Sequence, residues 1–385
     1  MLKSRKVIII ILAVIFFAGM ASETPAAEIN GISADAAILI DAETGQVLFA
    51  KQPFKKRPPA STTKVLTALM AIETGCLKDM VTVSKRAAGT GGSSIYLSKG
   101  ETLTLSDLIY GALMKSGNDA CVAIAEHIAG SVDRFVQLMN IRALAIGTLN
   151  THFTNPHGLP DEEHYTCAYD LALISRNALA NMKFSEIVAT RDKVIDWPGK
   201  EWDRKLHNTN KLLWGYLWAD GVKTGTTDAA GKCLIASASK DNRRLIAVVL
   251  RSGDRWGDCI RLFEYGFNHY EYRQVAVAGE QYRMLRVQNG TEEAFPVLYE
   301  SDLGILIPSD TPDAIEIRPE IKAYPMAPLR KGQVIGFVSY YINKQYTGKV
   351  KLIAGREVKK QKWWIHFFDS FLRLSWRNFD KCLEK

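Results

Sequence analysis

The sequence has little net charge outside its ends, no apolar run long enough to span a bilayer, and no closely spaced metal ligands. Its 49 Lys and Arg exceed its 41 Asp and Glu, yet residues 28–358 carry a net charge of only about +2. No basic stripe remains to neutralise phosphates, which argues against nucleic-acid binding. The seven histidines form no H-E-x-x-H and the six cysteines no C-x-x-C, so neither a metal nor another cofactor is indicated.

The N-terminus has the layout of a secretory signal peptide. Three basic residues among the first six precede the apolar run Val7–Ala18, and alanines suited to cleavage follow it. An uncleaved anchor is the weaker alternative, because the run is shorter than the ~20 residues of a membrane span. We expect residues 1–27 to be a signal peptide and the protein to be exported, with mostly free thiols because several cysteines lie in apolar segments.

The C-terminus has the pattern of an amphipathic membrane-anchor helix, over residues 358–385. At 100° per residue its apolar side gathers Trp364, Phe367, Phe368, Phe371, Leu372, Trp376, Phe379 and Leu383. Cations at its start and along the opposite side suit a membrane interface that contains anionic lipid. A terminal helix docked on the protein's own core is the alternative.

The chain between these ends predicts two domains. Two strands joined by a turn at 43–45 precede a block of helical periodicity from 61 to about 180, and strands return near 221, before a helix from 255 to about 267. This order predicts an α+β domain, residues 28–270, in which an antiparallel sheet is covered by helices and carries an inserted helical subdomain. Short alternating runs punctuated by Gly and Pro predict a small all-β domain, residues 271–357.

Three short motifs with chemical potential occur in order in the first domain. They are S-x-x-K at 61–64, S-x-N at 116–118 and K-T-G at 223–225, and each alone is weak because S-x-x-K also occurs at 237–240. Ser61 opens a helical run, so Ser61 and Lys64 lie one turn apart on one face. Residues 237 and 240 end a strand-like run, in which residues three apart point to opposite faces.

The first and third motifs suit nucleophilic catalysis. A serine hydroxyl needs a base within hydrogen-bond distance, and a lysine can serve if burial or a neighbouring cation promotes loss of its proton. Lys223 is a candidate for that cation and for attracting an anionic substrate. The backbone N–H of Ser61 and one from the strand-like segment 223–226 are candidate donors to an oxyanion.

The ordered motifs resemble those of the penicillin-recognising serine enzymes. Segments 59–64, 114–120, 155–160 and 220–231 are similar to those of the low-molecular-weight D-alanyl-D-alanine carboxypeptidases, and the likeness extends over nearly the whole chain. It implies a β-lactamase/transpeptidase-like catalytic domain that removes the terminal D-alanine from peptidoglycan stem pentapeptides and is inhibited by β-lactams. It also implies a location on the outer face of the bacterial cytoplasmic membrane, reached through the C-terminal helix.

The resemblance implies roles for individual residues. Ser61 would be acylated, Lys64 would be its general base, and Ser116 would relay the proton to the leaving D-alanine. Asn118 would hold the peptide and help to position Lys64. The remaining substrate-binding candidates are Lys223 and Thr224 near the terminal carboxylate, Gly225, Thr226 as the second oxyanion donor, and, by a looser match, Arg255.

Two other enzyme activities and one non-enzymatic role compete with this interpretation. A β-lactamase would need a deacylating Glu, but neither Glu162 nor Glu163 precedes Leu-Asn as in class A enzymes. A D,D-endopeptidase acting on cross-linked peptidoglycan would share every catalytic residue. An inert wall-binding scaffold is disfavoured because all three motifs are intact.

Three further features are expected to be structural. The Gly- and Ser-rich segment 89–94 lacks a following Gly-Lys-[Ser/Thr], so we expect a loop near the helical subdomain. His157 is expected to shape a turn beside the cleft, and the aromatic tract Trp214, Tyr216 and Trp218 is expected to be buried.

Overall fold

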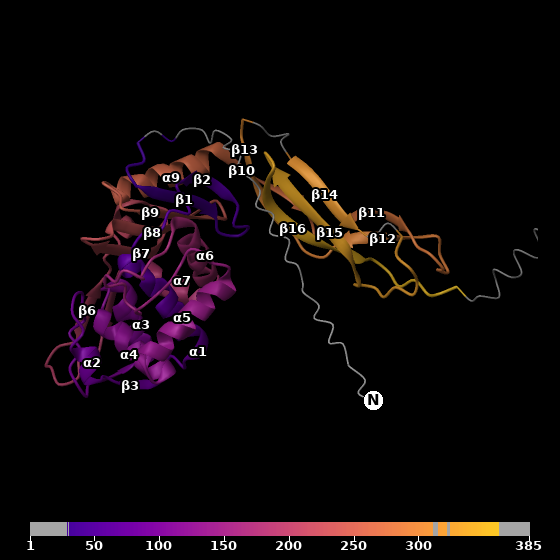
Figure 1. The fold of residues 1–385 in the computed structure, drawn as a ribbon. Coiled ribbons are helices and arrows are strands. Elements are labelled where there is room, and N and C mark those ends of the chain that lie inside the picture. The colour runs from indigo at the N-terminus through magenta and orange to yellow at the C-terminus, as the bar shows by residue number, and fades with distance from the viewer. Residues whose placement is uncertain (1–28, 30, 311–314, 322–323, 362–385) are drawn as a thin grey trace, which may run out of the picture.

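The chain folds around a five-stranded antiparallel sheet (Figure 1). The computed structural model describes residues 29, 31–310, 315–321 and 324–361. The sheet order is β2-β1-β9-β8-β7, so the strands before and after the helical block are neighbours and the predicted α+β architecture is confirmed. The bounds are β1 Ala36–Asp41, β2 Val47–Lys51, β7 Ala219–Thr227, β8 Gly231–Lys240 and β9 Arg243–Leu250.

Both faces of this sheet are buried, because alternate side chains point to opposite sides. In β1, Ile38 and Ile40 belong to a core shared with the helical block, whereas Leu39 belongs to a second core. Helix α9 (Arg255–His269) covers the second core. Among the described strands β7 pairs with β8 alone, so it forms the edge of the sheet.

The predicted helical block lies between β2 and β7 and also contains short strands. Helix α1 (Lys64–Thr74) runs through its middle and contacts α3, α4, α5, α6 and α7. The other helices are α2 Lys85–Ala88, α3 Leu105–Met114, α4 Asn118–Ala129, α5 Val132–Ile146, α6 Ala168–Leu179, α7 Met182–Ala189 and α8 Leu212–Gly215. Two strand pairs are formed by β3 Met80–Thr82 with β4 Thr102–Thr104, and by β5 Asp192–Ile195 with β6 Arg204–His207.

The region after α9 is all-β, as predicted. Its larger sheet has the order β11-β12-β16-β15-β14, and β10 pairs with β13 in a two-stranded sheet. The bounds are β10 Tyr270–Ala276, β11 Gln281–Arg286, β12 Ala294–Tyr299, β13 Leu303–Pro308, β14 Ile315–Ile321, β15 Val334–Ile342 and β16 Gln345–Ala354. Phe295, Val338 and Leu352 are fully buried in its own core.

Strand β13 joins the two parts of the molecule. Ile305 and Ile307 pack in the core of the all-β region, whereas Leu306 between them packs in the core under α9. The Gln46 side chain donates to the Leu306 carbonyl at 2.7 Å and accepts from the Leu306 amide at 3.1 Å. Figure 1 shows β10 and β13 between the two sheets. The period-2 geometry of a strand therefore lets β13 serve two cores at once.

Two predictions fall outside the described residues, namely the signal peptide at 1–27 and nearly all of the anchor helix at 358–385. Within residues 29, 31–310, 315–321 and 324–361, no helix is both long and apolar enough to cross a bilayer. The cysteines of that part of the chain are free thiols: Cys76, Cys121, Cys167, Cys233 and Cys259.

Candidate active site

Ser61 and Lys64 face each other across one turn of chain at the start of α1. A 3-10 turn, Ala60–Thr63, carries Ser61, and α1 begins at Lys64. The Lys64 Nζ atom donates to Ser61 Oγ at 2.9 Å. The Thr63 hydroxyl is tied back to the Ala60 carbonyl at 2.9 Å, which fixes the turn. The predicted proximity of the serine and the lysine is therefore observed.

Lys64 is fully buried and has three hydrogen-bond acceptors. Besides Ser61, its Nζ atom donates to Asn118 Oδ1 at 2.7 Å and to the His157 carbonyl at 2.6 Å. Burial lowers the pKa of Lys64 from 10.5 to about 8, although Cys121 and Asp119 oppose this shift. At this pKa roughly a tenth of the amine is neutral at pH 7, and this neutral form can accept a proton from Ser61.

The loop at 155–160 supplies the His157 carbonyl. Gly158 has φ +90°, and a Cβ atom there would lie 1.8 Å from the Ala60 carbonyl oxygen, so only glycine fits against the Ser61 turn. Burial first, and then the charge of Lys64, lower the pKa of His157 to about 3. The imidazole is neutral at physiological pH. It is the backbone carbonyl of His157, not the ring, that accepts the hydrogen bond from Lys64.

The second motif lies in the turn between α3 and α4. Asn118 is the first residue of α4 and its amide contacts Lys64. Ser116 is buried with φ +64°, but within the described part of the chain its hydroxyl has no hydrogen-bond partner. The structure thus brings Asn118 to the serine–lysine pair, whereas no hydrogen bond among the described residues joins the Ser116 hydroxyl to that pair.

The third motif lies on the edge strand β7, directly beside Ser61. A Cβ atom on Gly225 would be 3.2 Å from the Ser61 amide nitrogen and 3.0 Å from the Pro59 carbonyl, so the two backbones are in close contact. Lys223 is buried, and its Nζ atom donates to the Thr224 carbonyl at 3.1 Å. Burial, and then the charge of Lys64, lower the pKa of Lys223 well below its usual value.

The remaining three predicted residues are Thr224 and Thr226 in β7 and Arg255, which contacts that strand. Arg255, the first residue of α9, donates from Nη1 to Thr226 Oγ1 at 2.8 Å and to the Gly225 carbonyl at 3.0 Å. Thr224 Oγ1 lies 2.9 Å from Thr209 Oγ1. All nine predicted site residues therefore lie in, or directly against, the three motif segments, and their roles stay predictions.

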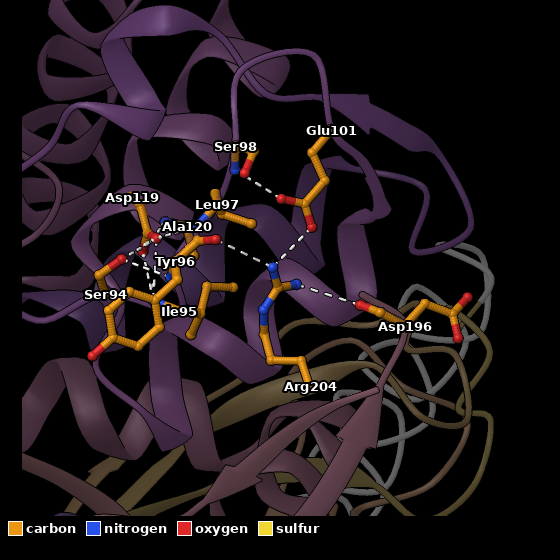
Figure 2. Close-up of polar contacts among 10 residues, drawn as sticks. All are labelled: Ser94, Ile95, Tyr96, Leu97, Ser98, Glu101, Asp119, Ala120, Asp196 and Arg204. Atoms are coloured by element: carbon orange, nitrogen blue, oxygen red, sulfur yellow. Dashed lines mark hydrogen bonds and ion pairs between the residues drawn. The ribbon is translucent and has the colours of Figure 1, made fainter. Parts of the chain in front are cut away.

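The sequence analysis did not predict that the loop at 89–94 holds Asn118 in place. The Gly- and Ser-rich segment is a loop, as expected, but its Gly91 carbonyl accepts from Asn118 Nδ2 at 2.7 Å and its Ser93 carbonyl accepts from the Asn118 amide at 2.7 Å. The Asp119 carboxylate accepts from Ser94 Oγ at 2.5 Å and from the amides of Ile95 and Leu97 at 3.1 Å (Figure 2). An Asp in the first turn of a predicted helix was the only sequence signal for this anchor.

A buried histidine was missed as well. His164 Nδ1 accepts from the Thr154 amide at 3.0 Å, so its proton is on Nε2, which lies 2.9 Å from Thr63 Oγ1. Burial lowers its pKa to about 4. This neutral ring therefore braces the Ser61 turn from behind.

The competing S-x-x-K motif at 237–240 lies elsewhere. Ser237 is in β8 and donates to Asp220 Oδ1 at 2.6 Å. Glu162 and Glu163 are exposed. No group of three or more His, Cys, Asp or Glu side chains able to hold a metal occurs among the described residues.

The expected burial of the aromatic tract was wrong for Trp214 and Trp218, and Tyr216 is only partly buried against the core under α9. Trp214 is 43% exposed and Trp218 is 36% exposed. Trp214 stacks on His207 with 4.5 Å between ring centroids, and Lys240 lies over the Trp218 ring at 5.7 Å. Partial cover by polar neighbours, rather than core packing, satisfies these rings.

A serine–lysine pair on an inserted helix, closed by a K-T-G edge strand, defines a serine peptidase of the penicillin-recognising class. The family model described as "D-alanyl-D-alanine carboxypeptidase" (peptidase S11) matches residues 21–253, and the model described as "Penicillin-binding protein 5, C-terminal domain" matches residues 270–360. The chain belongs to the S11 family of D-alanyl-D-alanine carboxypeptidases.

Individual relatives match along most of their length. The chain is 35% identical to the D-alanyl-D-alanine carboxypeptidase DacF of Bacillus subtilis, covering 85% of this chain and 86% of DacF. It is 34% identical to the D-alanyl-D-alanine carboxypeptidase DacA of Escherichia coli, over 85% of this chain and 84% of DacA. Its fold is similar to the crystal structure of penicillin-binding protein 5 from Haemophilus influenzae, with a TM-score of 0.75, 32% identity, and coverage of 86% and 98%.

Proposed function

We propose that this protein is a serine-type D-Ala-D-Ala carboxypeptidase that acts on peptidoglycan stem pentapeptides through an acyl-enzyme on Ser61. The observation that carries this function is the buried Lys64 amine, 2.9 Å from the Ser61 hydroxyl and with its pKa lowered to about 8. Membership of the S11 family supports the same activity and the same sensitivity to β-lactams.

In the proposed reaction Ser61 Oγ attacks the carbonyl carbon of the penultimate D-alanine and its proton passes to Lys64. The peptide C–N bond then breaks, the leaving D-alanine amine takes up a proton through Ser116, and an ester remains on Ser61. Water hydrolyses this ester with Lys64 again as the base, which restores the serine. A β-lactam would form the same ester by opening its ring, and the acyl-enzyme would persist.

The surrounding residues have binding roles in this proposal. The amides of Ser61 and Thr226 are the oxyanion donors, which is supported by the close contact of β7 with the Ser61 backbone at Gly225. Lys223, Thr224 and Arg255 attract the terminal carboxylate of the substrate. Because burial and Lys64 lower the pKa of Lys223, an arriving carboxylate stabilises its protonated form.

The decisive experiment follows free D-alanine released from a synthetic pentapeptide by the purified protein. Release that is lost in Ser61→Ala, together with mass spectrometry of a penicillin adduct on the Ser61 peptide, is the expected result. Cleavage of a cross-linked muropeptide without release from the pentapeptide would identify an endopeptidase, and an adduct on another serine would reject the mechanism.

We also propose that the catalytic domain (28–270) is exported and is held at the outer membrane face through the all-β domain (271–357) and the amphipathic segment 358–385. The support is the sequence pattern of residues 1–27 and of the C-terminal segment. Deleting residues 359–385 should move the mature protein from the membrane fraction to the soluble fraction, and retention in the membrane fraction would contradict the anchor.

A further inference from the structure

A buried ion pair between Arg204 and Glu101, called the clamp below, lies on the outer side of loop 89–101, which holds Asn118. Arg204 in β6 donates from Nη2 to Glu101 Oε1 at 2.8 Å, and both residues are almost completely buried. Arg204 Nη2 also lies 3.4 Å from the Tyr96 carbonyl, and its Nη1 donates to the Asp196 carbonyl at 3.3 Å. Figure 2 shows Arg204 between Glu101 and Asp196, with the backbone carbonyl oxygen of Tyr96 directed to the same guanidinium.

The backbone at 95–98 is held from two sides, by Asp119 next to Asn118 and by Glu101 of the ion pair. On the inner side, Asp119 accepts from the amides of Ile95 and Leu97, which flank Tyr96. On the outer side, Glu101 Oε2 accepts from the Ser98 amide at 2.8 Å while Oε1 binds Arg204. Tyr96 itself has φ +60° and a largely exposed ring, so its own packing does not hold this backbone.

The loop in turn determines how the Asn118 amide is oriented. Its Gly91 carbonyl takes the Nδ2 hydrogen bond, which turns Oδ1 toward Lys64. A one-ångström shift of a positioning group can cost as much as about 10²-fold in rate. An arginine buried with a carboxylate stabilises a fold only weakly compared with apolar residues of the same volume, so fold stability is a weak explanation for this pair.

We propose that Arg204 and Glu101 are positioning residues for the carboxypeptidase reaction: their ion pair holds the 89–101 loop, and through it Asn118, against Lys64. This inference rests on the proposed function. Neither residue touches the reacting atoms, so neither is catalytic. Their effect reaches the chemistry through the Asn118 amide.

The test is the second-order rate of Ser61 acylation by a fluorescent penicillin, measured against pH, in the double variant Glu101→Met/Arg204→Met. Removing both charges avoids an unpaired buried ion, so the protein should fold with a melting temperature close to that of the wild type. We expect acylation to fall about 10- to 100-fold. The half-exposed pair Glu73 and Arg142 gives a matched control, Glu73→Met/Arg142→Met, which should acylate at the wild-type rate.

The pH profile separates positioning from simple loss of folded protein. The titratable groups facing Lys64 are Asp119, Cys121, His157, His164 and Lys223, and the variant leaves all of them in place. If the Asn118 amide turns away, the Lys64 ammonium loses an acceptor, so the acidic limb of the acylation profile moves to lower pH. Loss of folded protein would instead lower the rate equally at every pH.

A milder variant keeps the test valid if the double variant does not fold. Arg204→Lys retains the charge, but its single terminal nitrogen cannot replace both Nη2, which contacts Glu101, and Nη1, which contacts the Asp196 carbonyl, so we expect an intermediate rate. Acylation at the wild-type rate in these variants, or a fall that is uniform with pH, would overturn the role of the pair. If the wild-type protein itself is not acylated on Ser61, the proposed function fails instead.

Discussion

The catalytic part and the all-β part of the chain differ in what they bury. Between residues 29 and 269, charged side chains are buried at eight positions: Asp41, Lys64, Glu101, Asp119, Asp170, Arg204, Lys223 and Asp258. In the described residues from 270 onward, the buried polar side chains are Ser339 and Thr347, and none is charged. Burying a charge is unfavourable unless it is paired and hydrogen-bonded, so the catalytic part has given up stability that the all-β part has kept. Five of these charges, Lys64, Glu101, Asp119, Arg204 and Lys223, lie in the active site or around the loop that holds Asn118, whereas the all-β part has an apolar core without such charges.

The largest expected difference between the two parts concerns their lysines. Lys64→Met should lower the rate of Ser61 acylation by about 10³-fold or more, because the serine loses its base. Lys351 in β16 is half-exposed and pairs with Glu300 at 3.0 Å, so Lys351→Met is the matched control and should acylate normally. Fluorescent-penicillin labelling against time measures both rates. Equal acylation rates in the two variants would show that the buried Lys64 is no more important for the reaction than the surface Lys351.

Two buried phenylalanines compare the cores. Phe153 in the catalytic part and Phe295 in the all-β part are both fully buried, so replacing either by Ala should lower the free energy of unfolding by about 3–5 kcal/mol. Phe153 packs against His164 with 5.5 Å between ring centroids, so only Phe153→Ala should also slow acylation. Chemical denaturation and acylation rates together check this. Slow acylation in Phe295→Ala would mean that the β core is part of the site.

The catalytic part and the all-β part should also differ in how they respond to pH. Below about pH 8 the Lys64 amine is mostly protonated in the free enzyme and cannot accept the Ser61 proton. Acylation should therefore rise about tenfold per pH unit on the acidic side and level off above pH 8. The stability of the all-β part should change little over pH 6–9, because burial keeps the pKa of Tyr340 above its usual value. A flat acylation profile would exclude Lys64 as the base.

The smallest expected effect concerns two strand glycines. A Cβ atom on Gly225 would press on the Ser61 amide at 3.2 Å and on backbone carbonyl oxygen at 3.0 Å, so Gly225→Ala should slow acylation about tenfold. On Gly348 in β16 it would meet the flexible Leu303 side chain at 3.1 Å, so Gly348→Ala should leave acylation unchanged. Equal rates would show that β7 can move away from Ser61 at little cost.

Much of the fold and of the candidate site could be predicted from the sequence. Local periodicity predicted the strands around 43–45, the helical block and the all-β region, because hydrophobic spacing directly reports which face of an element is buried. The three motifs predicted the pairing of Ser61 with Lys64, since residues three apart on a helical turn must be neighbours. The aromatic tract was misjudged because local periodicity does not show that His207 and Lys240, rather than core side chains, lie against Trp214 and Trp218.

The sequence by itself determined the order of elements and the chemical identity of the reacting groups, because both are written in local spacing and side-chain type. The tertiary structure alone decided what surrounds them. The burial that lowers the pKa of Lys64, the loop that orients Asn118, and the Arg204–Glu101 clamp behind that loop all join segments far apart in the chain. Desolvation and hydrogen-bond direction depend on the whole packed environment of an atom, and no local pattern of residues specifies them.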